Sequence, residues 1–208
     1  MKDNEKLDIY YKGKLVLSDY ETARKKSEKN PYEDLAIAEL EGHTVGKDEE
    51  KTDAVTIIKK LGKDDAIYGL GDKPGCLNKR GYSYVNWNTD DPAPHVDSFK
   101  SLYKSIPFFI VLGDEYCYGI FVDNTYKTTF DFGYENTDYY FVEHEKGELD
   151  YYFMPGNDMA EVVGLYTSLT GTTPLYQRWI YGSHQSRWGY YTPVSYTHLR
   201  AHETELHL

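Results

Sequence analysis

The fold is decided by two runs, LYKSIPFFIVL at residues 102–112 and YCYGIFV at residues 116–122, which Gly113-Asp114-Glu115 separate. Both runs are short, apolar and rich in aromatic and β-branched residues, which fit the pleated, half-buried surface of a strand. The glycine and the two acidic residues between them are typical of a tight connection. The sequence therefore predicts a β-hairpin here.

Further short, aromatic-rich runs lie on both sides of this hairpin. We expect strands at residues 54–58, 128–132, 139–143 and 149–154, with Gly or Asn in the turns between the later ones. Such close spacing is typical of an antiparallel sandwich. Two other features indicate turns and a loop rather than strands. Turns are expected on both sides of Asp72-Lys73, at Gly69, Gly71, Pro74 and Gly75. The segment that follows Gly75 is expected to be a loop.

One helix is predicted after the last of these strands. Asn157 or Asp158 can cap its start, and Gly171 can end it in a left-handed conformation. The apolar residues between them recur at intervals of mostly three and four, namely Met159, Val162, Val163, Tyr166 and Leu169. After Pro174, the run Trp179-Ile180-Tyr181 is expected to begin a strand that belongs to another domain.

Composition and charge narrow the class of protein. The 208 residues are 40% hydrophobic and include 22 Tyr, 8 Phe and 3 Trp, which is enough for one well-cored, mainly β domain. The net charge of -11 repels phosphate backbones and anionic lipid, so neither nucleic acid nor a membrane surface is an expected partner.

The start of the chain, its apolar runs and its cysteines add two expectations. The charged start has no apolar signal region, and no apolar run approaches the roughly 20 residues of a membrane span, so we expect a cytoplasmic protein. Cys76 and Cys117 lie far apart in the sequence and are expected to be free thiols.

Two motifs that could bind a cofactor or metal fail when their spacing is counted. Gly69-Leu70-Gly71 would need a glycine at the position of Pro74 to be a dinucleotide fingerprint. The segment from His202-Glu203 to His207 is one residue too long for a zinc-protease motif, although His198 and His202 have helical spacing. We therefore expect no cofactor and no metal.

Acidic residues could still serve sugar chemistry. A retaining glycosidase needs two carboxyl groups about 5 Å apart, whereas the adjacent Asp90 and Asp91 point apart in an extended chain. The segment Trp87-Asn88-Thr89-Asp90 nevertheless combines an indole, an amide and a carboxylate, the groups that recognise sugar faces and hydroxyls. A polar turn is the alternative interpretation.

A family resemblance runs from about residue 67 to residue 190. Its motifs occur in order and are individually weak: YGLGDK (68–73), LNKRG (77–81), WNTD (87–90), IPFF (106–109), GIFVDN (119–124), FDFG (130–133), LTG (169–171) and HQSRWGY (184–190). Together this series resembles glycoside hydrolase family 31, which contains α-glucosidases and α-xylosidases. Asp72 departs from the Glu of many members, which affects a turn.

The resemblance implies a fold and two site residues. It implies a galactose-mutarotase-like β-sandwich over residues 1–174 and the truncated first strand of a (β/α)8 barrel over residues 175–193. It also implies that Asp90 hydrogen-bonds an α-linked oligosaccharide and that Trp188 packs against a sugar ring. The expected parent protein is a retaining α-glycosidase, with its catalytic barrel in the same chain.

The end of the sequence departs from that family. A barrel needs roughly 250 residues, and the 30 residues from Trp179 onward include neither the family's nucleophile nor its acid/base. We therefore expect no catalytic residue in this chain and no hydrolysis by it. Residues 194–208 are a non-family tail that resembles either translated adaptor DNA or a short native linker.

Two other functions are compatible with the sequence. The chain could be a stand-alone carbohydrate-binding module without turnover, or, by analogy of fold only, a mutarotase-like epimerase.

Overall fold

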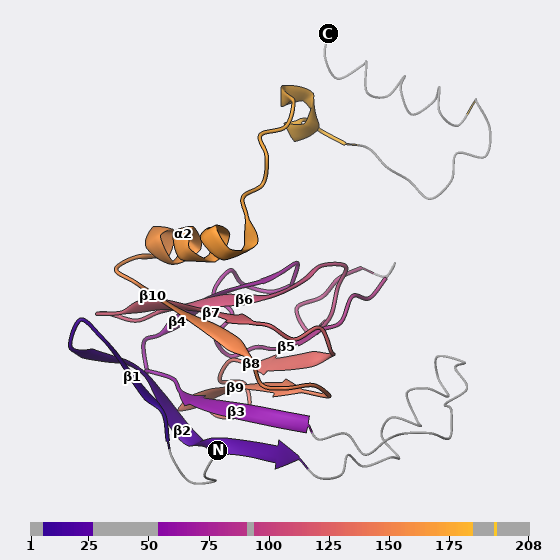
Figure 1. The fold of residues 1–208 in the computed structure, drawn as a ribbon. Helices are drawn as coiled ribbons and strands as arrows, with labels where there is room; N and C mark the ends of the chain where they lie inside the picture. Colours follow the sequence, from indigo (N-terminus) through magenta and orange to yellow (C-terminus); the bar gives the residue numbers. More distant parts are fainter. Residues whose placement is uncertain (1–5, 27–53, 91–93, 185–193, 195–208) are drawn as a thin grey trace, which may run out of the picture. The chain divides into compact units, whose positions relative to one another are not determined.

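The computed structural model describes residues 6–26, 54–90, 94–184 and 194 (Figure 1). Its internal contacts divide the chain into two units, Met1–Gly171 and Thr172–Leu208. The first unit contains ten strands and one helix in the described residues, and the second contains a short 3-10 helix. No helix among the described residues is long and apolar enough to cross a membrane.

The strands of the first unit form two antiparallel sheets, which confirms the expected sandwich (Figure 1). The larger sheet has, in spatial order, β1 (Asp8–Tyr11), β2 (Lys14–Lys26), β3 (Ala54–Lys60), β9 (Tyr139–His144), β8 (Thr128–Asp131) and β5 (Ser83–Asn86). The smaller sheet has β10 (Tyr151–Gly156), β7 (Cys117–Val122), β6 (Ser105–Leu112) and β4 (Ala66–Gly71).

The predicted hairpin is the β6–β7 pair at the centre of the smaller sheet. Phe109 lies opposite Ile120, and the Gly113 N–H donates to the Tyr116 carbonyl at 2.9 Å to close the turn. Strands β8, β9 and β10 also lie where strands were expected, with bounds that differ by one or two residues. The aromatic runs thus form strands, as the sequence predicts.

Aromatic side chains from both sheets fill the space between them. Phe109 of β6 is fully buried, and its ring lies 4.9 Å from that of Phe132, 5.5 Å from that of Tyr140 and 5.9 Å from that of Phe130. Tilted and edge-to-face arrangements of this kind are the favoured geometries of aromatic pairs. The high aromatic content of the sequence is therefore used in the core.

Helix α2 (Met159–Thr170) covers the outer face of the smaller sheet, where it was predicted. The Asp158 side chain accepts from the Glu161 N–H at 2.8 Å, and Gly171 ends the helix at φ +89°. The fully buried Val162 and the Tyr166 ring, stacked 4.0 Å from Phe108, face the sheet. Two of the predicted apolar positions, Val163 and Leu169, are exposed instead.

The expectation of turns at Gly69 and Gly71 was wrong, because both residues belong to strand β4. Gly69 has φ +133°, and a Cβ there would lie 2.4 Å from the Phe108 carbonyl oxygen. The pairing of β4 with β6 shifts register between the two glycines. Glycine serves here to let a strand bulge and approach its neighbour closely.

The positions of three other strands were not predicted from the sequence. Strand β5 lies in the segment expected to be a loop, and β1 and β2 lie in the charged N-terminal segment. In β2, only residues 14–17 showed an alternating pattern. Strands β1 and β5 are edge strands, and β2 has few apolar residues among its charged ones, which weakens the hydrophobic pattern on which strand prediction depends. Residues 35–40, which mix apolar and acidic side chains, lie outside the described residues.

The strand expected at Trp179–Tyr181 is instead a 3-10 helix, η1 (Arg178–Tyr181). Its backbone bonds are local: the Ile180 N–H donates to the Gln177 carbonyl at 3.0 Å and the Gly182 N–H to the Trp179 carbonyl at 3.1 Å. A strand requires a neighbouring strand for its hydrogen bonds. Residues 172–184 contain no strand in the described structure, so local bonds satisfy this backbone.

Two buried lysines hold the connection between β4 and β5. Lys73 Nζ donates to the Val85 carbonyl at 3.1 Å, and Lys79 Nζ donates to the carbonyls of Lys73 and Pro74, each at 3.1 Å. Burial lowers the pKa of Lys73 to about 8 from an ordinary 10.5, and the nearby Asp72 opposes this only in part. The backbone carbonyls fix both ammonium groups.

We predict that Gly69→Ala destabilises the sandwich by several kcal/mol, roughly 3 or more, because the methyl group would clash with the backbone of Phe108 and force a strained φ. Gly164→Ala is the matched control, since a Cβ at this exposed helical position meets nothing within 4 Å. It should stabilise by about 0.5–1 kcal/mol. Urea unfolding measures both, and equal effects would contradict the close approach of β4 to β6.

We predict that Lys73 makes stability rise between pH 7 and pH 9.5. The unfolded chain holds this proton up to about pH 10.5, whereas the folded chain releases it near pH 8, so raising the pH favours the folded state. The expected gain relative to Lys73→Met is on the order of 1–2 kcal/mol. Urea unfolding across this range tests it, with Lys63→Met as the exposed control. Parallel pH profiles for the unchanged chain and Lys73→Met would contradict the prediction.

Candidate functional site

Asp90 lies in the segment that directly follows strand β5. The end of β5 and this segment are both anchored to the chain just before β6: the Val85 N–H of β5 donates to the Lys100 carbonyl at 2.8 Å, and the Thr89 N–H of the segment donates to the Leu102 carbonyl at 3.0 Å. The Thr89 hydroxyl also donates to the Trp87 carbonyl at 3.0 Å. Asp90 itself is exposed. The loop therefore exposes the Asp90 carboxylate to solvent on a backbone that hydrogen bonds hold in place.

The second predicted site residue, Trp188, lies outside the described residues. Asp91, the neighbour of Asp90, and the histidines at 198, 202 and 207 lie outside them too. Of the two predicted sugar-binding residues, the structure therefore places only Asp90, and it does not test whether the two come together.

A cavity of about 400 Å³ lies beside the Asp90 loop. It is formed by the end of β5, the start of β6 and the connection between β7 and β8. Its lining residues are Asn86, Trp87, Asn88, Ser105, Pro107, Asn124, Thr125, Tyr126 and Thr128. Small-molecule sites commonly occupy about 300–1,000 Å³, so the cavity is large enough for a small ligand.

The rim of this cavity is aromatic, and its connection is held in place. Trp87 is 54% exposed and Tyr126 is 50% exposed. The Asn124 amide donates to the carbonyls of Lys146 and Glu148 at 3.0 and 3.2 Å and accepts from the Tyr126 N–H at 2.8 Å. Asn124 thus fixes the backbone that carries Tyr126.

The floor of the cavity continues into a polar row across the larger sheet. Asn86 lies opposite Thr128 in the β5–β8 pair, and Thr128 lies opposite His144 in the β8–β9 pair. All three are buried, and the Thr128 hydroxyl lies 3.0 Å from His144 Nδ1. Burial lowers the pKa of His144, and the nearby Glu143 opposes this. Interior-facing strand positions are usually apolar, so this row is exceptional.

Several polar atoms at this end of the sandwich lack a hydrogen-bond partner. Among the described residues, the buried side-chain atoms without one are Asn86 Nδ2 and Oδ1, Ser105 Oγ and His144 Nε2. Native structures contain few such atoms, because each leaves a desolvation cost of about 1–3 kcal/mol uncompensated. Sequence reasoning missed this feature. Its signal is the polar Asn86 at the same strand face as the buried Tyr84.

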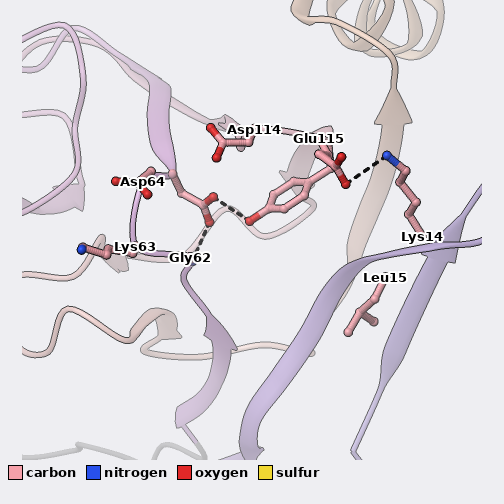
Figure 2. Close-up of a pocket in the computed structure, with 9 residues that line it drawn as sticks. Lys14, Leu15, Gly62, Lys63, Asp64, Asp114 and Glu115 are labelled. Atoms are coloured by element: carbon pink, nitrogen blue, oxygen red, sulfur yellow. Dashed lines mark hydrogen bonds and ion pairs between the residues drawn. The ribbon is translucent and has the colours of Figure 1, made fainter.

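A second cavity, of about 450 Å³, lies at the opposite end of β6 (Figure 2). It contains several carboxylates, but the buried Asp65 is used structurally. Asp65 accepts from the Tyr116 hydroxyl at 2.6 Å and from the Gly62 N–H at 2.7 Å. Burial and the bond to Asp65 raise the pKa of Tyr116. Lys14 also forms an ion pair with Glu115 at 3.1 Å. The polar groups at this end therefore bind one another and connect neighbouring strands.

The described residues contain no group of three or more His, Cys, Asp or Glu side chains placed to hold a metal ion. Cys76 is exposed, Cys117 is buried and neither is bridged. The chemistry available at the Asp90 end is therefore hydrogen bonding by a carboxylate, amides and hydroxyls, combined with stacking on aromatic rings.

A family model and individual relatives agree on the family to which this chain is similar. Residues 2–131 match the family described as Glycosyl hydrolase 31 N-terminal galactose mutarotase-like domain. The chain is 45% identical to alpha-glucosidase 2 of Bacillus thermoamyloliquefaciens over 138 residues, which are 66% of this chain and 17% of that protein. It is 35% identical to alpha-xylosidase XylQ of Lactiplantibacillus pentosus over 122 residues, which are 59% of this chain and 15% of that protein.

A solved structure agrees with these sequence matches. The GH31 dextranase of Flavobacterium johnsoniae, complexed with glucose, is 38% identical and superimposes with a TM-score of 0.60 over 78% of this chain and 17% of that one. The chain thus spans about a sixth of the length of the relatives that it matches. The chain belongs to glycoside hydrolase family 31, through its N-terminal galactose mutarotase-like domain.

Proposed function

We propose that this domain serves a retaining α-glycosidase that releases terminal α-linked glucose, or a close relative such as α-xylose, from oligosaccharides. The domain's own contribution is substrate binding. Asp90 accepts hydrogen bonds from sugar hydroxyls near the cleaved bond, and Trp188 provides an aromatic face. The names of the relatives, an α-glucosidase and an α-xylosidase, support this class of reaction.

The observation that carries the proposal is the anchored loop after β5. The Thr89 N–H bond to the Leu102 carbonyl fixes this loop before any ligand arrives, and the Val85 N–H bond to the Lys100 carbonyl fixes the end of β5. The Asp90 side chain stays exposed. A group that is already in position loses little freedom when the substrate binds. The loop can therefore orient a sugar without rearranging the sandwich.

Covalent chemistry is assigned to other parts of the enzyme. A retaining mechanism needs a nucleophile and an acid/base about 5 Å apart across the sugar. We infer that these residues belong to regions that the relatives have beyond the matched sixth of their length. By itself, the 208-residue chain is expected to bind substrate weakly and not to hydrolyse it.

We predict that the 208-residue chain releases no p-nitrophenol from p-nitrophenyl α-D-glucopyranoside, and that a full-length enzyme carrying this domain does. In that enzyme, Asp90→Asn should lower kcat/KM by about 10- to 100-fold, because a charge-assisted hydrogen bond contributes about 1.5–3 kcal/mol. Asp114→Asn, exposed at the opposite end of β6, is the matched control and should leave kcat/KM unchanged.

Two results would contradict the proposal. Hydrolysis by the 208-residue chain would show that it contains its own catalytic carboxylates. An unchanged kcat/KM in Asp90→Asn would show that this carboxylate does not contact the substrate in the transition state.

A further inference from the structure

We propose that the cavity beside the Asp90 loop is a second carbohydrate site, which binds one pyranose ring independently of Asp90. The ring, free or at the end of an oligosaccharide, would lie between the aromatic rim and the polar floor. Asp90 does not line this cavity. The inference therefore stands whether or not Asp90 contacts a glycosidase substrate.

The unpaired polar atoms are the first argument. The described buried side-chain atoms without a hydrogen bond belong to Asn86, Ser105 and His144. Asn86 and Ser105 both line the cavity, one from each sheet, and Asn86 is only 8% exposed. An amide that has both its donor and its acceptor unused matches a sugar hydroxyl, which can donate and accept at once.

The shape of the opening is the second argument. Trp87 and Tyr126 are about half exposed and line the cavity from different connections. Aromatic rings of this kind pack against the apolar face of a sugar, while their polar edges stay in water. The cavity volume of about 400 Å³ lies in the range of small-molecule sites.

Charge indicates a neutral ligand. None of the nine lining residues is Asp, Glu, Lys, Arg or His, so the lining has no formal charge. An anionic or cationic ligand would lose its water without gaining a counter-charge. A neutral, hydroxyl-rich ring has a smaller desolvation cost than an ion. The amides and hydroxyls of the floor can replace the hydrogen bonds that it made with water.

Access needs only a local adjustment. Asn86 lines the cavity, but its amide nitrogen and oxygen are buried, so a sugar hydroxyl reaches them only if this side chain or the rim rotates. Asn124 fixes the backbone of the β7–β8 connection. The exposed Tyr126 ring is the part that can move.

The test is titration of the ¹⁵N-labelled 208-residue chain with methyl α-D-glucopyranoside, followed by NMR. We expect saturable shifts of the Trp87 indole and of the backbone amides of Asn86 and Ser105, with a Kd in the millimolar range, as for a single small polar ligand. Sorbitol, a polyol without a ring face, should give no saturable shift. Isomaltose should shift the same signals if a terminal unit is accepted.

Variants of the lining residues test this site. Asn86→Leu should weaken sugar binding at least tenfold, and it should raise the melting temperature without sugar because the unsatisfied amide is removed. Tyr126→Ala, at an exposed rim position, should weaken sugar binding without affecting folding. Tyr126→Phe, which keeps the aromatic ring, should retain sugar binding. Asp114→Asn, exposed at the opposite end of β6, should bind methyl α-D-glucopyranoside as the unchanged chain does.

Three outcomes would overturn the inference. The first is the absence of a saturable shift in the unchanged chain. The second is binding that survives both Asn86→Leu and Tyr126→Ala. The third is a lower melting temperature for Asn86→Leu without sugar, which would show that ordered water already satisfies these atoms.

Discussion

Strand β6 is buried on both of its faces, and this constraint organises the domain. Successive side chains of a strand point to opposite faces. Phe109 and Val111, which are fully buried, therefore face the larger sheet, while Phe108 and Ile110 face helix α2. Glycine makes this double burial possible, because a Cβ at Gly119 of the neighbouring strand would lie 2.7 Å from both Phe108 and Val162.

The two ends of β6 carry different kinds of polar chemistry. At the Leu112 end, Asp65 accepts from the Tyr116 hydroxyl and from backbone, so the polar groups satisfy one another. At the Ser105 end, Asn86 and Ser105 have unpaired buried atoms beside an aromatic rim and the exposed Asp90 loop. Because unpaired buried atoms are costly, the second end is the one whose polar groups are most naturally explained by a ligand.

Strong hydrophobic patterns could be read from the sequence, and special backbone geometry could not. The hairpin at residues 102–122 and the helix after Asp158 were predicted because apolar periodicity and caps are local signals. Gly69 and Gly71 were interpreted as turn residues, because glycine is a common turn signal. The reason that a strand needs glycine there is the close approach of β6, which only the tertiary structure shows. Trp179–Tyr181 indicated a strand, but strand formation depends on a partner that the sequence pattern alone does not provide.

The candidate site was predictable in part. The segment Trp87–Asp90 could be recognised from its residue types and from the family resemblance, and its anchoring follows from the fold. The polar row of Asn86, Thr128 and His144 could not be recognised, because its members lie on three strands far apart in the sequence. Cross-strand register, which brings them together, is a long-range property.

Native-state hydrogen exchange of the 208-residue chain tests most directly whether the β6 frame fixes the site loop. We expect the amides of β6, paired on both sides by β4 and β7, to exchange most slowly, through global unfolding. We also expect the Thr89 amide, bonded to the Leu102 carbonyl, to be strongly protected. Exchange of the Thr89 amide at an unprotected rate, with β6 still protected, would show instead that the loop moves independently of β6.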